Sequence, residues 1–470
     1  MALQGFAVGT IFPGAKYLRG PIRSFFKMSN QSSISSLSSV WLNKYRSRGV
    51  TSTCNTPKVA PTAIGDENSL QPEFKIHGKK IKKDKSQNLS PKPITASEKA
   101  ILNYIDTHGQ LQTKEKDRNL KNLLPKQYLR VKTDPTIVYL INTTAAKTFS
   151  NAIKAENPDR NSPVLEIQPG LGLLTSELLN TVGYKYLTGL EDNPELATYL
   201  ASEYNIAVIE CSISDIPRYH HLDKHDGGER IHEILNKIKT STNSNEDRRL
   251  HIVGTAPNIG TINFLIRSYA TKRIFFEDGL PWNGVTLFLA LGSKVHAICT
   301  ASPESGLVTY RTTSVFCQSL FHFKKIAVLP RDAFIPWDVK DTEVRKGPKT
   351  RKIKVVNPDL LTVMRVDINE EAANLIGREN LFAYWYFVRE HLYARTNRII
   401  PELEKWCPGC GRRLIRQGFD IYSIFGELTP DEILKLYLQF VSWPEFSYSS
   451  FLNAVEKFQT RIEISEDGDH

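Results

Sequence analysis

A glycine turn followed by an acidic residue is the feature of this chain best suited to hold a ligand. Gly170 and Gly172 follow an apolar run at 164–167, and Glu191 follows a second apolar run at 186–190. Glycine lets the backbone turn sharply and lets a ligand approach the amides that open the next helix. A carboxylate after the second strand can accept hydrogen bonds from the two hydroxyls of a ribose. The pattern therefore predicts a nucleoside pocket.

Alternating strand and helix patterns would position this pocket. We expect strands at 164–167, 186–190, 207–210, 251–254 and 285–291. Strands that alternate with helical segments favour a parallel sheet with crossover helices, and hence an α/β fold. The polar stretch 227–246 interrupts the alternation, and we interpret it as an insertion before the fourth strand.

Composition divides the chain into five segments. Residues 1–65 contain Lys, Arg and many Ser but no Asp or Glu, which is typical of a mitochondrial transit peptide; a basic tail without that role is the alternative. We predict a polar linker at 66–123, an α/β domain at 124–368, a helical C-terminal domain at 369–462 and an acidic tail at 463–470. Within the helical domain, Thr429 is expected to cap a helix that Pro430 begins.

Charge and cysteine usage narrow the class of protein. Lys and Arg number 61 against 50 Asp and Glu, and the net charge of +11 favours a polyanionic partner. Six cysteines in 470 residues do not suggest a disulfide framework, which indicates a reducing compartment. Cys407 and Cys410 supply two of the four ligands of a structural zinc site, so we predict no metal. No run of 18 apolar residues occurs, and we expect no membrane span.

Several segments beyond the glycine turn resemble the rRNA adenine dimethyltransferases of the KsgA/Dim type. The likeness covers roughly residues 124–462 and includes the entry segment 126–138, LGSKVHA at 291–297 and VLPRDAFIP at 328–336. It implies a Rossmann-like class I S-adenosylmethionine methyltransferase domain with a small helical C-terminal domain. The positions that it implies for contact with S-adenosylmethionine are Leu129, Gly170, Gly172, Glu191, Cys211 and Thr255.

The motif that would aim an adenine at the methyl donor departs from the family pattern. The family's Asn-Leu/Ile-Pro-Tyr/Phe supplies a side-chain carbonyl for the exocyclic amine and a ring that stacks on the flipped base. The residues at these positions are Thr255, Ala256, Pro257 and Asn258. In addition, Gln168 replaces the family's first glycine, and Cys211 replaces an acid that contacts the cofactor's adenine. We therefore predict that no catalytic site is intact.

The degenerate motif, the leader composition and the C-terminal segments FVSWP (440–444) and FLNAVEKFQ (451–459) resemble the mitochondrial transcription factor B group, its fungal members in particular. That resemblance implies an initiation factor of the mitochondrial matrix that acts with the single-subunit mitochondrial RNA polymerase. Its nucleic-acid partners would be promoter DNA and single strands, and S-adenosylmethionine would be a vestigial ligand. Two alternatives stay open: an active dimethyltransferase of mitochondrial small-subunit rRNA, and an RNA-binding ribosome-assembly protein.

Two basic segments are candidates for phosphate contact. One is the loop 344–354, and the other is the stretch 384–398, which we expect to form one helix with its aromatic residues in the core and its arginines exposed. The candidate residues are Arg345, Lys346, Lys349, Arg351, Lys352, Lys354, Arg389, Arg395 and Arg398.

Overall fold

The computed structural model describes residues 96–108, 123–132, 135–240, 248–306, 308–337 and 357–465. All of them belong to one unit, Ile94–His470. Three predicted segments lie outside the described residues: the leader at 1–65, the linker at 66–123 apart from residues 96–108 and 123, and the basic loop 344–354.

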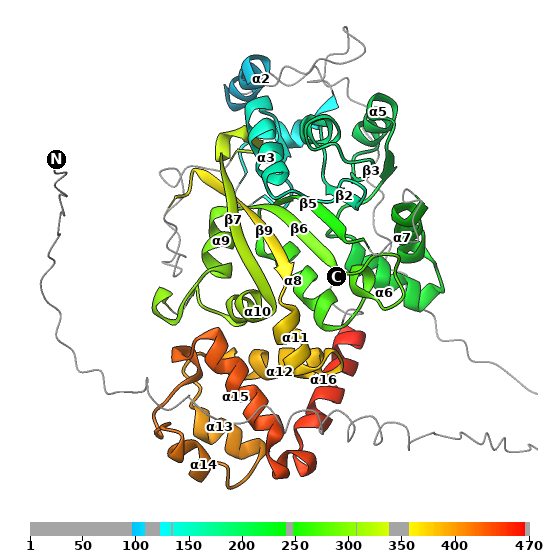
Figure 1. The fold of residues 1–470 in the computed structure, drawn as a ribbon. Coiled ribbons are helices and arrows are strands. Elements are labelled where there is room, and N and C mark those ends of the chain that lie inside the picture. The colour runs from blue at the N-terminus through cyan, green and yellow to red at the C-terminus, as the bar shows by residue number, and fades with distance from the viewer. Residues whose placement is uncertain are drawn as a thin grey trace, which may run out of the picture. The chain divides into compact units, whose positions relative to one another are not determined.

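A seven-stranded sheet in the order β4-β3-β2-β5-β6-β9-β7 forms the centre of this unit (Figure 1). The parallel strands are β2 (Pro163–Ile167), β3 (Tyr186–Leu190), β4 (Ala207–Ile209), β5 (Leu250–Ala256) and β6 (Val285–Leu291). The predicted strands and their parallel arrangement are therefore confirmed. Two further strands were not predicted: β9 (Leu360–Ile368) runs antiparallel between β6 and β7 (Phe321–Pro330).

The strand order places the ligand crevice of such a sheet. The chain moves outward from β2 to β3 and β4, and then returns to the other side of β2 at β5. In open α/β sheets, ligands bind beyond the carboxyl ends of the strands where the order reverses in this way. Here that point is the end of β2, where the predicted glycine turn lies.

Helices surround the sheet. Their bounds are α2 (Ala96–His108), α3 (Thr143–Ala155), α4 (Leu173–Glu177), α5 (Pro194–Tyr204), α6 (Ile216–Asp226), α7 (Arg230–Thr240), α8 (Ile259–Ala270), α9 (Ser293–Cys299) and α10 (Thr312–Leu320). Helix α7 corrects our interpretation of 227–246 as an insertion. Its buried residues Ile231, Ile234 and Ile238 recur at helical spacing, and the helix packs against β2 and β4.

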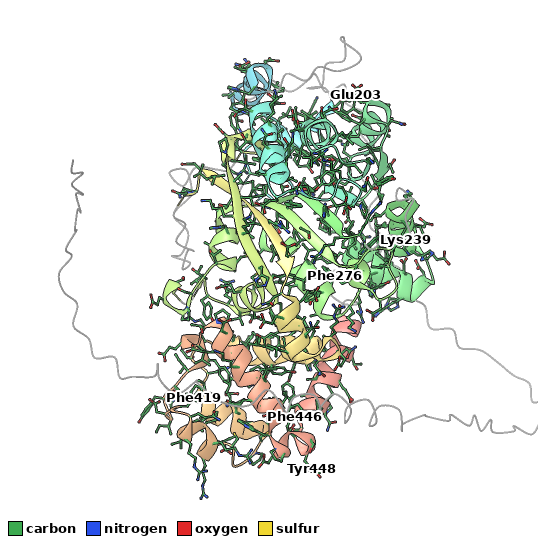
Figure 2. All side chains as sticks on the ribbon, viewed as in Figure 1. Glu203, Lys239, Phe276, Phe419, Phe446 and Tyr448 are labelled. Carbon is green, nitrogen blue, oxygen red and sulfur yellow. The ribbon has the colours of Figure 1, made fainter. Side chains whose placement is uncertain are left out.

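The C-terminal helices gather at one end of the sheet, next to α8 and α10 (Figure 1). They are α11 (Glu370–Ile376), α12 (Leu381–Leu392), α13 (Ile399–Trp406), α14 (Gly411–Arg416), α15 (Pro430–Ser442) and α16 (Phe451–Ser465). Their outer end carries the labelled Phe446, which is buried, and Tyr448, which is exposed (Figure 2). No helix among the described residues is long and apolar enough to cross a membrane.

Helix boundaries in this region follow local signals. The predicted cap of α15 is confirmed: the Thr429 hydroxyl accepts from the Glu432 amide, and the Glu432 carboxylate accepts from the Thr429 amide. The stretch that we expected to be one helix is broken, because α12 ends at Leu392 and α13 begins only at Ile399.

The amino-terminal segment of the described chain is part of the core. The 3-10 turn η2 (Lys126–Leu129) and the short strand β1 (Tyr139–Leu140) contribute buried residues to the cluster that also contains Leu171 and Val253. Strand β1 pairs antiparallel with β8 (Phe334–Ile335). This pairing fixes the segment over the carboxyl end of β2.

Candidate functional site

The glycine turn after β2 has the backbone geometry that the sequence predicts. Gly170 and Gly172 have φ values of +58° and +75°, which glycine adopts without steric cost. A Cβ on Gly170 would lie 2.6 Å from Cδ1 of Tyr139, and a Cβ on Gly172 would lie 2.4 Å from Cε2 of Tyr204. Gln168 also has a positive φ, +54°, so the turn keeps the left-handed backbone where the family's first glycine is lost.

Glu191 lies beneath this turn and accepts three hydrogen bonds from the protein. Its Oε2 accepts from the amide of Gly170 at 3.1 Å. Its Oε1 accepts from the amide of Asn193 at 3.1 Å and from the hydroxyl of Tyr139 at 2.8 Å. The side chain is 0% exposed, and this burial raises the pKa of the carboxyl to about 7 although the three hydrogen bonds lower it. The structure thus brings Gly170 and Glu191 together as predicted.

Tyr139 is the residue of this site that sequence reasoning missed. Its hydroxyl donates to Glu191 and lies 3.2 Å from Oδ1 of Asp192, and its ring meets that of Tyr128 edge-on at 4.8 Å between centroids. The side chain is 0% exposed, and burial raises the pKa of the phenol. The phenol therefore uses a hydrogen-bond acceptor of Glu191 that the sequence analysis assigns to a ribose. The only signal in the sequence is that Tyr139 directly follows the entry segment 126–138.

The other predicted donor contacts are also buried by the protein itself. Leu129 in η2, Cys211 after β4 and Thr255 near the end of β5 are each at most 7% exposed. Burial raises the pKa of the Cys211 thiol to about 12, so it is a neutral group where the family has an acid. Glu191 has no surface that water can reach. In this arrangement the residues do not fit a bound S-adenosylmethionine.

The degenerate acceptor motif is engaged within the protein. The side-chain oxygen of Asn258 caps α8 by accepting from the amide of Gly260 at 2.9 Å. The Asn258 side-chain nitrogen donates to the carbonyl of Thr136, and the Thr255 hydroxyl donates to the carbonyl of Val138, both at 3.5 Å. Neither residue presents a free carbonyl for the exocyclic amine of an adenine.

Comparison with known proteins identifies the family of this scaffold. Residues 129–408, more than half of the chain, match the family model described as ribosomal RNA adenine dimethylase. The chain belongs to this family. The seven-stranded sheet with its flanking helices is accordingly the α/β fold of the S-adenosylmethionine methyltransferases, carrying a helical C-terminal region.

Individual relatives of this dimethylase-family chain are distant. The chain is 27% identical over 376 residues to "Dimethyladenosine transferase 2, mitochondrial" of Drosophila melanogaster, a match that covers 71% of this chain and 82% of that protein. A crystal structure of a "putative RNA methyltransferase" from Pyrococcus horikoshii is 11% identical and covers 48% of this chain and 84% of its own, with a TM-score of 0.22. A "putative methyltransferase" from Thermobifida fusca is 12% identical and covers 57% and 87%, with a TM-score of 0.27. Scores this low have no bearing on function.

The three predicted arginines of the helical region differ in their surroundings. Arg389 is exposed at the end of α12, with its guanidinium 4.4 Å from the ring centroid of Phe458. Arg398 is exposed and lies 5.3 Å from the ring of Tyr422, which is 68% exposed. Arg395 corrects our expectation: it is half-buried, and its guanidinium donates to the carbonyls of Pro303 and Gly426 at 2.8 and 2.6 Å. Arg395 therefore ties two loops of the dimethylase scaffold together.

The candidate residues Arg345, Lys346, Lys349, Arg351, Lys352 and Lys354 lie outside the described residues. Cys407 and Cys410 are buried free thiols whose pKa values burial raises to about 11 and about 12. Within the described ranges, no group of three or more His, Cys, Asp or Glu residues is placed to hold a metal ion.

Proposed function

We propose that this chain is a mitochondrial transcription initiation factor of the transcription factor B type, which uses a dimethylase scaffold to bind nucleic acid without transferring methyl groups. It would act in the matrix with the single-subunit mitochondrial RNA polymerase, and help to melt promoter DNA and to stabilise the open complex. The observation that carries this proposal is the state of the acceptor motif: Asn258 caps a helix, Thr255 binds a backbone carbonyl, and no aromatic residue follows Pro257.

Methyl transfer to an adenine amine depends on positioning. The amine must be held in line with the methyl group, and an extruded base must be stacked on a ring. A threonine hydroxyl is shorter than the family's asparagine and has no side-chain carbonyl, and the Thr255 hydroxyl is directed at the carbonyl of Val138. The loss of these two groups removes the contacts that would position the adenine for methyl transfer. Basic and aromatic side chains on the surface remain available to contact phosphates and bases.

Several features support binding to nucleic acid. The segment 344–354 contains six Lys and Arg and no Asp or Glu, and such a local concentration of positive charge attracts a polyanion. The exposed ring of Tyr422 beside the Arg398 guanidinium is a pair that can stack on a base and contact its phosphate. The acid-free composition of residues 1–65 and the mitochondrial designation of the Drosophila relative support a mitochondrial location.

An active rRNA adenine dimethyltransferase of the mitochondrial small subunit is the second candidate. The family match and the name of the Drosophila relative favour it. The two candidates differ in one measurable reaction, because only the second incorporates methyl groups from S-adenosylmethionine into a small-subunit rRNA helix.

Run-off transcription tests the proposal. The mitochondrial RNA polymerase is assayed on a linear promoter template with and without the full chain, and a template without the promoter serves as control. We expect run-off product only when both the chain and the promoter are present, and no labelled methyl group in rRNA. Run-off that is unchanged by the chain contradicts the proposal, and methyl incorporation establishes the alternative.

A further inference from the structure

We propose that Tyr139 takes the place of a nucleoside ribose within the protein, and that the segment Thr136–Tyr139 closes the ancestral donor site to any adenosine-bearing ligand. A ribose would use its hydroxyls as donors to Glu191. The Tyr139 hydroxyl makes that contact in cis, at 2.8 Å. Its ring fills the adjacent space against the Gly170 backbone, since even a Cβ on Gly170 would meet the ring at 2.6 Å.

The hydrogen bonds that Glu191 already accepts explain why a ligand would not displace the hydroxyl of Tyr139. Glu191 already accepts from the hydroxyl of Tyr139 and from the amides of Gly170 and Asn193. A ribose would gain one or two hydrogen bonds to the carboxylate, but it would have to take the place of the Tyr139 hydroxyl, whose other acceptor is Oδ1 of Asp192 at 3.2 Å. The exchange replaces one buried hydrogen bond with another, and the net contribution of one such bond is only about 1 kcal/mol, so the ligand gains little from it.

The same four residues also cover the acceptor side. The carbonyl of Val138 accepts from Thr255, and the carbonyl of Thr136 accepts from Asn258. Two of the positions that depart from the family pattern therefore bind the segment that bears Tyr139. Thr255 and Asn258, which replace the family's acceptor residues, thus help to hold the same segment that closes the donor site.

Backbone hydrogen bonds to the segment around β8 hold Thr136–Tyr139 in place on both sides. Strand β1 pairs with β8 through Tyr139 opposite Ile335, and the amide of Ile141 donates to the carbonyl of Ala333 at 2.8 Å. On the other side of the segment, the amide of Lys132 donates to the carbonyl of Trp337 at 2.9 Å. Opening the site requires breaking these backbone hydrogen bonds. The binding free energy of a small ligand that contacts only Glu191 would be smaller than this cost.

Truncation of Tyr139 provides the direct test. Tyr139→Ala removes the ring and the hydroxyl, and leaves a cavity bordered by Gly170 with one free acceptor on Glu191. S-adenosylhomocysteine, a non-reactive donor product, is titrated calorimetrically into the full-length wild type, Tyr139→Ala, Tyr139→Phe and the double variant Tyr139→Ala/Glu191→Gln. We expect 1:1 binding to Tyr139→Ala alone, because Tyr139→Phe keeps the ring and the double variant lacks the carboxylate.

The Tm of the wild type and of Tyr139→Ala gives a second readout of ligand binding. We expect millimolar S-adenosylhomocysteine to leave its Tm unchanged, whereas the Tm of Tyr139→Ala rises by a few degrees. Stoichiometric binding to the wild type overturns the proposal, and so does a Tyr139→Ala variant that folds by circular dichroism but takes up no ligand. Neither result bears on run-off transcription, so this proposal and the proposed function fail separately.

Discussion

Two carboxyl groups are buried beside the glycine turn, and their raised pKa values make the stability of the protein depend on pH. Glu166 is fully buried and accepts one hydrogen bond, from the Thr175 hydroxyl at 2.8 Å, and burial raises its pKa to about 8. Glu191 has a pKa raised to about 7 for the same reason. A raised pKa means that the folded protein keeps a proton that the unfolded chain has already released. The stability from these groups is complete below about pH 4.5 and is lost as the pH rises through 7 to 8.

We predict that Glu166→Gln flattens this pH dependence. Between pH 5 and 8 the wild-type free energy of unfolding should fall by about 1.4 kcal/mol per pH unit for each such group that is protonated only in the folded state. The glutamine cannot ionise, so its slope should be smaller by up to that amount. Urea unfolding at several pH values measures both slopes, with the exposed Glu195→Gln on α5 as control. Equal slopes in the wild type and Glu166→Gln would show that Glu166 does not hold a proton.

Gly172 should be the least replaceable glycine of the turn. Gly172→Ala introduces a Cβ at a φ of +75°, 2.4 Å from the ring of Tyr204, and the strain and the clash together should cost more than about 2 kcal/mol. Gly279→Ala is the matched control, because Gly279 has a φ of +86° and nothing within 4 Å of its Cβ position. Its cost should be the strain alone, about 1 kcal/mol. Thermal unfolding that gives the two variants the same loss would contradict the clash.

The sequence was sufficient to predict the glycine turn and Glu191, but not their partner. The turn and the acid lie on successive strands of one motif, so their spacing is a local signal. Tyr139 is 52 residues from Glu191, and it reaches the carboxylate only because β1 pairs with β8 near the end of the α/β region. A contact of this kind depends on tertiary pairing, which no local pattern encodes.

At the level of elements, the buried strands were easier to predict than the later ones. Strands β2 and β6 are buried along their whole length and mostly apolar, because both of their faces are covered. Strand β7 is at the edge of the sheet and carries exposed residues such as Lys324, so its apolar pattern is diluted. Helix α7 was misinterpreted because its polar face dominates the composition, although its buried isoleucines follow helical spacing.

Capping of α15 is an element whose contribution can be measured. Thr429→Ala removes the hydroxyl that accepts from the Glu432 amide, and the loss of such a cap should cost about 1 kcal/mol. Ser442→Ala at the other end of the same helix is the control, since Ser442 is exposed and its hydroxyl only donates to the carbonyl of Gln439. It should change the free energy of unfolding by less than about 0.5 kcal/mol. Chemical denaturation measures the free energy of unfolding of both variants. A larger decrease for Ser442→Ala than for Thr429→Ala would contradict the prediction.

At the level of the whole molecule, positive charge should govern the affinity for nucleic acid. Most of the net charge of +11 comes from residues 1–65, which contain eight Lys and Arg and no Asp or Glu, so positive charge on the rest of the chain is local, as around Arg398 and in the loop 344–354. Contacts to phosphates release counterions, so each contact adds to the salt dependence of binding.

We predict that Arg398→Ala and Arg345→Ala each weaken binding to single-stranded DNA and flatten its salt dependence. The slope of log affinity against log salt should become shallower by about 0.7 for each lost phosphate contact. Arg378→Ala is the matched control, because Arg378 forms a surface ion pair with Glu370 at 2.9 Å. Fluorescence anisotropy across a salt series gives the slopes. A slope unchanged from the wild type in Arg398→Ala or Arg345→Ala would exclude that arginine from the interface.

Helix α10 belongs to the sheet and to the C-terminal helices at once. It packs against β7 on one side and against α12 and α15 on the other, with Phe316 meeting the ring of Tyr384 at 5.6 Å between centroids. Just before the helix, the hydroxyl of Tyr310 donates to the carbonyl of Leu428 at 2.6 Å. A chain shortened after Ile368 would expose this apolar face to water. We expect such a truncated protein to aggregate during expression, so its inactivity would reveal nothing about what the missing helices bind.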